Sequence, residues 1–548
     1  MDTIKIIYRD FEYTYPKGIA LLDISKDFCD DFMEDIIMGE VNGRPCELSF
    51  KLMDNCIINF YDNTSLIGNR VYESGLIFVL VEAIQNVLNS EIEVKHSIDK
   101  GIYIQVCKKI TRESLDKVYD EMKSIVKKDL PIRKNLVSRM EAINYYKSIG
   151  NYDKVNVLKY SVNTNVNLYR LNDNYDYFFS YLPVSTGCLR DFRLTYIDDN
   201  SFVLRYPNIY YMNKIPVYKH HEKLFNEFKK YDEWCKRLGS KNVSALNNRV
   251  SNGNINDLIL LSENIQNNSL FKIAETIKQN KKIKLVLIAG PSSSGKTTTS
   301  KKLELFLKGY GINPKSISID DYFVDRDKTP KLPDGSHDFE SIKAIDTETF
   351  NNDLKDLLDG KEVITPTYNF ITGKREYINE CMKLKDNEIL IIEGLHALNE
   401  ELTYSIEKKN KFKIYLCPLT VLSLDNHNRI RTTDNRLLRR MARDSRTRGY
   451  SASDTLSTWQ RVREGEEMYV FPFQDEADVI FNTSLIYELG VLKTYVEPLL
   501  YSVQEDDQNY KEAIRLLNLL KNVLPIATDF IPKDSIIREF IGGGYFHE

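Results

Sequence analysis

The stretch from residue 283 to residue 297 constrains the fold more than any other part of this 548-residue chain. Residues 283–289 are aliphatic at nearly every position, which indicates a strand buried on both faces of a parallel sheet. Gly290-Pro-Ser-Ser-Ser-Gly-Lys-Thr297 follows directly and fits G-x-x-x-x-G-K-[ST] at every fixed position. The residues that follow would place apolar side chains on one face of a helix and lysines on the other, as in an amphipathic helix. A strand, a glycine-rich turn and a helix in this order predict a phosphate-binding loop.

The chemistry of such a loop explains its spacing. Glycines let the backbone wrap closely round a phosphate, so that successive N–H groups and the helix N-terminus face the anion. Lys296 can then reach the β- and γ-phosphates, and the Thr297 hydroxyl can bind Mg²⁺. A turn without a ligand would not account for the flanking strand and helix. We therefore expect ATP and Mg²⁺ as cofactors, with the nucleotide held by Gly290, Ser292, Ser293, Ser294, Gly295, Lys296, Thr297 and Thr298.

Composition limits the class of protein. The chain is too long for one hydrophobic core, so roughly two to four domains are expected. Its 75 basic and 79 acidic residues nearly balance, which gives no general attraction to nucleic acid or membrane. The eight cysteines form no C-x-x-C pair and the seven histidines no ligand-spaced cluster, which argues against a zinc site or a disulfide framework. The sequence shows no signal peptide and only short apolar runs, so we expect a cytoplasmic protein without a membrane partner.

Residues 1–62 are predicted to form a small β-rich domain. Two short strand patterns flank Arg9-Asp10 as in a hairpin. After them the sequence predicts a short helix and then a further strand, which ends at the turn residues Asn42-Gly43. This order resembles the TGS domain, a module found at the start of threonyl-tRNA synthetases and in some GTPases.

Residues 63–215 are predicted to form an α+β domain. Helices are expected at 76–88 and 114–127 and a strand at 101–106, from their apolar periodicity. The order of these segments resembles the second additional domain of threonyl-tRNA synthetase, which hydrolyses mischarged tRNA.

The residues that carry chemistry in that editing domain are missing here. It uses an H-x-x-x-H pair and a C-x-x-x-H pair, and the aligned positions in this chain are Tyr72, Leu76, Phe178 and Leu182. None of these is a metal ligand or a proton carrier, so the editing chemistry should be absent. Cys188 lies nearby without a histidine at useful spacing and is expected to be structural. Two interpretations remain, namely a fold reused for binding or regulation and a scaffold that packs on the next domain.

The remaining chain divides into three parts. Residues 216–280 are polar with helical segments and are predicted to be a helical connector, in which the adjacent His220 and His221 should be solvent-exposed. Residues 281–500 form the predicted P-loop domain. Residues 501–548 contain a terminal helix and tail, which we expect to serve packing or assembly.

Two further strands in the P-loop domain end in carboxylates. One runs into Asp320 and Asp321, and residues 388–393 form a Walker-B-like strand that ends at Glu393. Because ligands bind at the carboxyl ends of parallel strands, these acids should lie at the phosphate loop. We expect Asp320 to accept a proton from the attacking hydroxyl, with Asp321 as the alternative, and Glu393 to hold Mg²⁺ together with Thr297.

Arginine is concentrated between residues 429 and 448. An RNA-binding face or a solvated helix would produce such a pattern. Downstream of a phosphate loop, a lid that closes over the transferring phosphates is the interpretation we favour. The arginines are Arg429, Arg431, Arg436, Arg439, Arg440, Arg443, Arg446 and Arg448.

Taken together, residues 283–482 resemble the uridine kinase branch of the uridine kinase/phosphoribulokinase family. The resemblance is carried by the phosphate loop, Ser318-Ile-Asp-Asp-Tyr-Phe323, Asp338-Phe-Glu340, Pro366-Thr-Tyr-Asn-Phe370, Glu393-Gly394 and Arg436-Leu-Leu-Arg-Arg-Met-Ala-Arg-Asp444. It implies an α/β P-loop kinase fold with a doubly wound parallel sheet, preceded here by the α+β TGS-like and synthetase-editing-like domains.

The resemblance also implies roles for single residues. Asp320 matches the catalytic aspartate, and Glu340 stands where the family has a ribose-binding aspartate. The other implied contacts are Tyr368 and Phe370 beside the base, Arg440 and Arg443 on substrate and phosphate, and Arg439 and Arg448 on ATP. Two positions depart from the family. Gly373 replaces a base-reading histidine, for which His337 or a backbone group could substitute, and Tyr450 replaces the last arginine of a lid motif.

The sequence therefore predicts an ATP-dependent kinase that phosphorylates the 5′-hydroxyl of a ribonucleoside, with uridine or cytidine as first choice. One alternative is a kinase of the same fold acting on another small hydroxyl metabolite. A second is a nucleotide-gated regulator that binds RNA or tRNA through the N-terminal half. The family resemblance leaves a homo-oligomer open.

Overall fold

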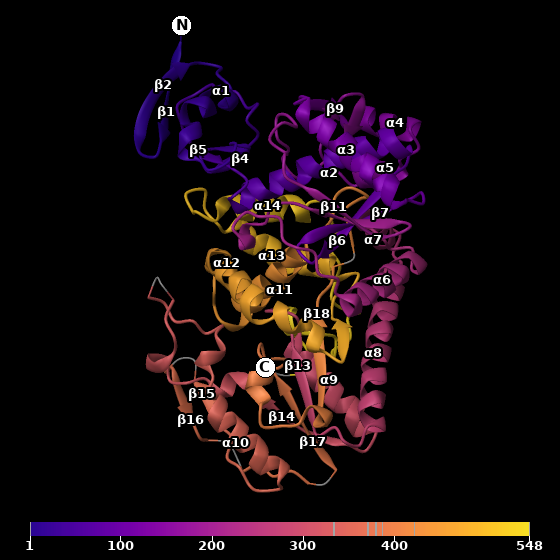
Figure 1. Ribbon diagram of the computed structural model, residues 1–548, viewed down its shortest axis with the longest axis vertical. Coiled ribbons are helices and arrows are strands. Elements are labelled where there is room, and N and C mark those ends of the chain that lie inside the picture. Colours follow the sequence, from indigo (N-terminus) through magenta and orange to yellow (C-terminus); the bar gives the residue numbers. More distant parts are fainter. Residues whose placement is uncertain are drawn as a thin grey trace.

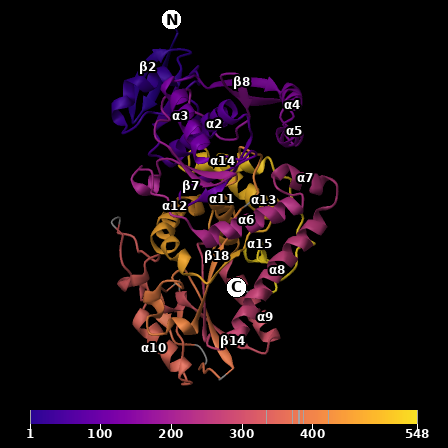
Figure 2. The same ribbon diagram turned by 45° about the vertical axis from the view of Figure 1, so that its right-hand side comes forward.

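The structure is a computed structural model that describes residues 2–332, 335–369, 372–378, 381–385, 387–420 and 422–546. Figure 1 shows the N-terminal half at one end of the long axis and the P-loop sheet at the other, with helices α11 to α14 between them. The turned view in Figure 2 keeps the same order, so these helices are the common layer on which both halves pack.

The first β-rich unit forms one mixed five-stranded sheet in the order β2-β1-β5-β3-β4. The predicted hairpin is confirmed: β1 and β2 pair antiparallel, with Arg9 and Asp10 at φ of 48° and 69° in the turn. Two successive residues in the left-handed region match the twist that a two-residue hairpin requires. The elements are β1 Thr3–Tyr8, β2 Phe11–Pro16, α1 Leu21–Ser25, β3 Met38–Val41, β4 Arg44–Cys46 and β5 Cys56–Tyr61.

The second unit surrounds one long helix. Its sheets run β11-β12-β7-β6 and β10-β9-β8, and the helices and strand expected from periodicity are present, although the first helix begins earlier, after a Ser65 cap. The elements are α2 Leu66–Leu88, β6 Ile92–Ile98, β7 Gly101–Val106, α3 Arg112–Lys127, β8 Arg133–Ser138, α4 Arg139–Ser148, α5 Tyr152–Lys159, β9 Asn165–Leu171, β10 Asn174–Asp176, β11 Arg193–Asp198 and β12 Ser201–Arg205.

Helix α2 is more apolar than the sequence prediction allowed for. By length and composition it could cross a membrane, and in the described part of the chain it is the one helix that meets this test. However, 72% of its apolar window is buried inside the fold, where it forms the centre of the second unit's core. Such burial is what a core helix of a folded domain shows.

The predicted connector packs closely against the P-loop sheet. It consists of α6 Glu222–Arg237, α7 Val243–Ser251 and α8 Ile255–Gln279. Helix α8 lies along α9, and both α6 and α8 contact β19. The expected exposure of His221 is wrong: only 7% of this residue is exposed, and its ring lies between Asp99 and Asp475. The reason is that His221 is the residue before the first turn of α6, where its ring contacts acids of two other segments.

The P-loop half contains a five-stranded, fully parallel sheet in the order β14-β17-β13-β18-β19. Alternate residues of β13 face opposite layers: α8 and α9 cover one side, and α10 covers the other. This explains its unbroken aliphatic sequence. The elements are β13 Leu285–Ala289, α9 Lys296–Gly309, β14 Asn313–Ser318, α10 Thr347–Leu358, β15 Thr367–Asn369, β16 Lys374–Glu376, β17 Glu388–Glu393, β18 Lys411–Cys417 and β19 Val479–Asn482.

The last elements form the layer between the two halves. They are α11 Thr432–Thr447, α12 Ala452–Tyr469, α13 Glu488–Tyr501 and α14 Tyr510–Leu520; the short helix α15 Arg538–Ile541 follows them and lies beside the P-loop sheet. A fully buried charge helps to fix the N-terminal half to this layer: Nζ of Lys154 lies 2.8 Å from Asp176 and 3.0 Å from Asp425, which belong to different halves. Buried charges are tolerated only when paired in this way.

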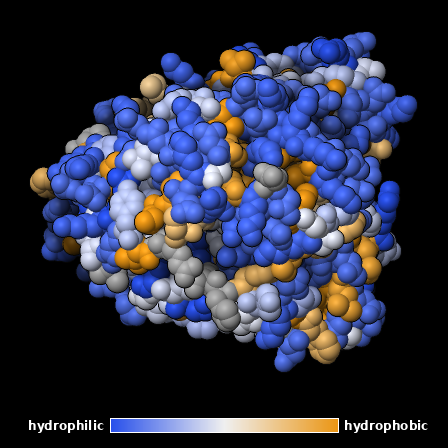
Figure 3. Space-filling model, turned by 90° about the horizontal axis from the view of Figure 1, so that it is seen from below, coloured by the Kyte–Doolittle hydropathy of each residue, from blue (hydrophilic) through white to orange (hydrophobic). Residues whose placement is uncertain are grey.

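The end of the molecule that carries the P-loop sheet is largely hydrophilic. Figure 3 shows apolar side chains in small separate groups on this face. Scattered apolar side chains of this kind are common on protein surfaces.

Candidate active site

The phosphate loop has the backbone conformation that its glycine pattern predicts. Gly295 precedes α9 with φ of 84°, and Ser293 has φ of 59°. Both residues lie in the left-handed region, which turns the loop back on itself before the helix begins. Nζ of Lys296 donates to the carbonyl oxygens of Gly290 and Pro291 at 3.1 and 3.4 Å. The lysine therefore lies over its own loop, where the β- and γ-phosphates of a nucleotide would lie.

Thr297 and Glu393 form the candidate metal site. The Thr297 hydroxyl donates to Oε1 of Glu393 at 3.3 Å, so the two predicted ligands lie side by side at the ends of α9 and β17. Burial raises the pKa of Glu393 to about 7; Lys296 opposes this rise, and the charges of Asp320 and Glu539 add to it. A hydroxyl and a carboxylate are oxygen ligands of the kind that Mg²⁺ prefers, so Thr297 and Glu393 would hold this ion.

Asp320 and Asp321 have different surroundings. Asp320 is exposed at the end of β14, and the protein around its carboxyl raises the pKa above its usual range while Lys296 and Arg448 oppose the rise. Asp321 instead accepts a hydrogen bond from the backbone N–H of Tyr368 at 3.3 Å. The carboxylate of Asp320 is therefore placed to accept a proton. The carboxylate of Asp321 instead helps to hold β15 in position through its hydrogen bond with Tyr368.

Tyr368, one of the two predicted base-binding residues, lies on β15 of the β15–β16 hairpin. Tyr368 is buried and meets Phe323 edge to face at 5.5 Å. Phe370 lies outside the described residues. Gly373 is at φ of 69°, and a Cβ at this position would lie 2.8 Å from the Arg326 side chain. Arg326 therefore covers the place where the expected histidine would have stood.

Glu340 lies beside α11 and α12, at the edge of the site. Burial raises its pKa to about 7; the charge of Glu466 adds to this shift, and Arg440 opposes it. Nη1 of Arg440 donates to the Ser292 hydroxyl at 3.0 Å. The structure thus brings the predicted ribose-binding acid, a predicted substrate arginine and the phosphate loop together.

The arginine-rich stretch is not one lid. Arg440, Arg443 and Arg448 gather round the fully buried carboxylate of Asp444 at 2.9 to 3.4 Å, and Arg448 remains half exposed. Arg439 is fully buried, and its donors reach Ser293, Thr483 and Glu488. Arg439 therefore supports the loop rather than projecting over it, because the core leaves it no free donor face toward a ligand. The lid interpretation fits Arg448.

The comparisons with known proteins address this part of the chain. Residues 285–486 match the model of the "Phosphoribulokinase / Uridine kinase family". This region is a domain of that family. Two curated proteins named uridine kinase, from Staphylococcus aureus strains JH9 and Newman, are each 28% identical over 198 residues, which cover 36% of this chain and 86% of the relative. The chain is accordingly a phosphotransferase with a hydroxyl acceptor, and it binds nucleotide through its P-loop.

Two solved structures resemble parts of the chain. A "Possible Uridine Kinase" from Bacillus stearothermophilus is 21% identical, with 36% of this chain and 89% of that chain covered and a TM-score of 0.23. D-glycerate 3-kinase from Cryptococcus neoformans is 16% identical, with 46% and 80% covered and a TM-score of 0.18.

One support of the kinase domain's loop was missed from the sequence. Glu466 is fully buried and accepts hydrogen bonds from Arg436 at 2.6 Å and from the Ser292 backbone N–H at 2.8 Å. Arg463 donates to it as well. Arg436 and Glu466 lie 30 positions apart on two different helices, so no local pattern in the sequence predicts that they pair. The acidic residues between positions 464 and 467 were the one sequence feature that could have indicated a role for Glu466.

The four positions that lack editing chemistry lie in one core. Tyr72, Leu76, Phe178 and Leu182 are all buried in the same hydrophobic cluster. The Tyr72 hydroxyl donates to the Asp191 carbonyl at 3.0 Å. Burial raises the pKa of Cys188 to about 12, so its thiol stays protonated. The side chains at these four positions therefore pack in the core of the second unit.

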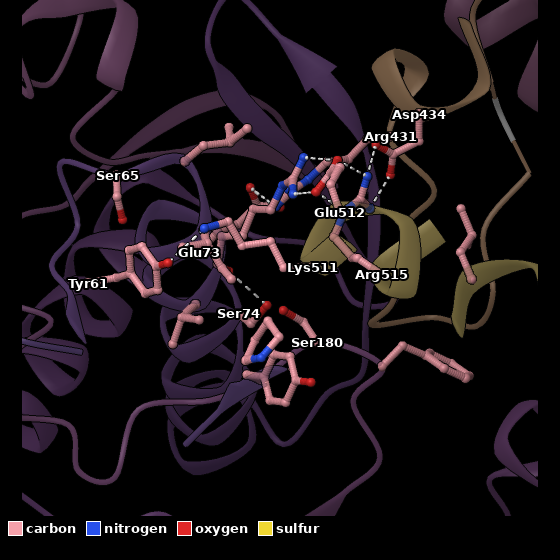
Figure 4. Close-up of a pocket in the computed structure, with 18 of the residues that line it drawn as sticks. Tyr61, Ser65, Glu73, Ser74, Ser180, Arg431, Asp434, Lys511, Glu512 and Arg515 are labelled. Carbon is pink, nitrogen blue, oxygen red and sulfur yellow. Dashed lines mark hydrogen bonds and ion pairs between the residues drawn. The ribbon is translucent and has the colours of Figure 1, made fainter. Parts of the chain in front are cut away.

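A cavity of about 1340 Å³ lies between the N-terminal half and the kinase domain, away from the phosphate loop. Figure 4 shows Tyr61 and Glu73 from one half facing Arg431, Lys511 and Glu512 from the other. Several charges in its wall are paired, as with Arg70 and Glu512 at 2.6 Å. The cavity therefore lies within an ionic interface between the halves.

Proposed function

We propose that this chain is an ATP- and Mg²⁺-dependent kinase that phosphorylates the 5′-hydroxyl of a ribonucleoside, with uridine and cytidine as the first acceptors to test. One observation carries the proposal: Lys296, Thr297, Glu393 and Asp320 converge at the carboxyl ends of β13, β14 and β17. That edge of a doubly wound sheet is where ligands bind. Position and fixed charge supply most of the catalysis in phosphoryl transfer.

Each residue has a role in this proposal. Asp320 takes the proton of the acceptor hydroxyl, and Lys296 and Arg448 neutralise charge on the transferring phosphoryl group. Mg²⁺, when bound, would lie on Thr297 and Glu393 and neutralise phosphate charge. Glu340 would hold the ribose hydroxyls, Arg440 and Arg443 the substrate side, and Tyr368 with Phe370 the base.

The acceptor is the least constrained part of the proposal. Gly373 brings no side chain to the base, and Arg326 lies over it. Loss of a hydrogen-bonding partner weakens discrimination between bases, so another small hydroxyl acceptor is the second candidate. The RNA-binding alternative is less favoured, because the arginines that motivated it are engaged within the protein. Arg429 and Arg431 pair with Glu73, and Arg436 pairs with Glu466.

We also propose the division into residues 1–62, 63–215, 216–280, 281–500 and 501–548. The first two would serve as a TGS-like and an editing-like module without editing chemistry. Their firm docking on the kinase domain supports the scaffold interpretation, and the cavity between the halves keeps a binding role open to test.

A coupled assay of ADP release, with Mg-ATP and a panel of nucleosides and non-nucleoside alcohols, tests the proposal. Lys296→Ala should lower kcat by about 10² to 10³, and Asp320→Asn by about 10² to 10⁴. Asp321→Asn is the matched control, because its carboxylate holds the hairpin and should act mainly on KM. Turnover that survives Asp320→Asn but not Asp321→Asn would refute the assignment of Asp320 as the proton acceptor. Activity only on a non-nucleoside would refute the nucleoside assignment.

A further inference from the structure

The C-terminal segment, defined here as residues 531–543, returns to the phosphate loop. After α14 the chain leaves the layer between the halves and ends beside β13 and α9, as Figure 1 shows. Within the segment, α15 packs against α11. Ile536, Ile537 and Phe540 are fully buried. This part of the chain is therefore an integral wall of the nucleotide site.

A carboxylate of this segment occupies an anion position of the loop. Oε2 of Glu539 accepts a hydrogen bond from the backbone N–H of Thr298 at 3.0 Å. Thr298 lies in the first turn of α9, where unpaired N–H groups face the bound phosphates of a nucleotide. A carboxylate and a phosphate oxygen cannot both accept this N–H, and their negative charges repel. Glu539 thus stands where the nucleotide phosphate would bind.

Apolar contacts cover the same side of the loop. Cγ2 of Ile536 lies 2.6 Å from the place where a Cβ on Gly295 would stand, so the segment touches the loop backbone itself. The guanidinium of Arg439 lies 4.9 Å from the ring centre of Phe540. The apolar side chains of the segment therefore pack against the loop backbone and against the arginine that supports the loop.

The anchors of the segment lie around the loop. Nη2 of Arg446 donates to the carbonyl oxygen of Glu539 at 2.9 Å, and Lys302 pairs with Asp534 at 3.1 Å. On the other side, Gly542 and Gly543 have φ of 82° and 68°, a conformation that glycine adopts at little cost. Five apolar side chains of the segment are buried, namely Ile531, Ile536, Ile537, Phe540 and Ile541, so the contact for which a nucleotide phosphate competes directly is that of the Glu539 carboxylate with the Thr298 N–H.

We propose that the C-terminal segment is an autoinhibitory strap: Glu539 takes the place of a nucleotide phosphate on the Thr298 N–H, and Mg-ATP binds only when the strap moves away. This inference rests on the proposed use of ATP at this loop.

Binding of Mg-ATP to the full chain, measured by titration calorimetry, tests the strap. Glu539→Gln keeps the size of the side chain and removes its charge, so the Kd for Mg-ATP should fall about ten- to a hundred-fold, the range for a hydrogen bond to a charged group. Asp529→Asn is the matched control, because Asp529 is an exposed acid just before the segment, and it should leave the Kd unchanged. Circular dichroism checks that both variants fold.

Hydrogen exchange gives a second measurement that does not depend on a variant. Exchange of residues 531–543 should rise when Mg-ATP saturates the wild-type chain, and should not rise with Lys296→Ala at the same nucleotide concentration. Equal Kd values for wild type and Glu539→Gln, or a strap that stays protected in saturating Mg-ATP, would overturn the proposal. Tighter ATP binding by Glu539→Gln without phosphorylation of any acceptor would leave the strap standing and count against the proposed function.

Discussion

Oε1 of Glu73 accepts two hydrogen bonds from Arg429, from Nε at 3.0 Å and from Nη2 at 2.9 Å. Its other oxygen accepts from Arg431 at 2.8 Å. Glu73 belongs to α2 of the N-terminal half, and both arginines precede α11 of the kinase domain. Although burial works in the opposite direction, the two arginines lower the pKa of Glu73 to about 2. The start of the arginine-rich stretch therefore joins the halves.

Glu73→Ala should destabilise the protein by about 3–5 kcal/mol, because it leaves two buried guanidinium groups without their partner. Urea denaturation at neutral pH measures the free energy of unfolding. Glu113→Ala is the control: its pair with Lys117 is exposed on one helix surface, and such a pair contributes at most about 0.5 kcal/mol. A loss below about 1 kcal/mol for Glu73→Ala would mean that the halves dock by other contacts.

Stability should fall as pH rises from about 4.5 to 7. The pKa of Glu393 and that of Glu340 are each raised to about 7 in the folded chain, so over this window the folded state retains protons that the unfolded state has released. In the Glu393→Gln variant, the free energy of unfolding should fall by about 2 kcal/mol less over this pH range than in the wild type. Denaturation at pH 5 and pH 8 measures it, with Glu388→Gln at the other end of β17 as control. A pH dependence unaltered by Glu393→Gln would contradict the shift.

The apparent affinity for Mg²⁺ should rise with pH through about 7, since a carboxylate binds the ion only when ionised. Titration of the ATP-loaded chain with Mg²⁺ at pH 6 and pH 8 measures this change. Glu393→Gln should bind Mg²⁺ more weakly and lose most of the pH dependence. An affinity that is equal at both pH values would place the metal on other groups.

Gly373→Ala should destabilise the protein by more than about 1 kcal/mol and impair acceptor binding. The new Cβ meets a positive φ and also the Arg326 side chain at 2.8 Å. Gly360→Ala has a similar φ of 74° with open space around it, so it reports the cost of conformation alone, about 1 kcal/mol. Thermal unfolding measures the stability of both variants, and the KM for the acceptor measures binding. If Gly373→Ala and Gly360→Ala changed stability and KM to the same extent, the Arg326 side chain would have moved aside at little cost.

Asp444→Asn should lower kcat by about 10- to 100-fold, because Arg440, Arg443 and Arg448 share this buried carboxylate and lose their fixed positions. Steady-state kinetics with the acceptor identified by the panel measures it. Asp454→Asn, at the exposed start of α12, should leave kcat within about twofold. An effect on stability alone would make Asp444 a structural residue.

The parts predicted from sequence are those fixed by short-range pattern. The strand, loop and helix around Lys296 follow from apolar periodicity and glycine spacing, and the Arg9-Asp10 hairpin from its two flanking strands. The packing of α6 and α8 on the sheet and the pairing of Arg436 with Glu466 did not follow, because both depend on contacts between segments far apart in the chain. The same holds for His221 and Glu539, whose partners are supplied by other elements.

The parallel sheet also sets an order of events during synthesis. Strands β14, β17 and β13 leave the ribosome well before β19 and the helices after it, and domains fold from the N-terminus as they emerge. The strap comes last of all. The phosphate loop of a nascent chain thus forms while Glu539 is still inside the ribosomal exit tunnel. At this stage of synthesis a nucleotide can bind the Thr298 N–H without competition from Glu539.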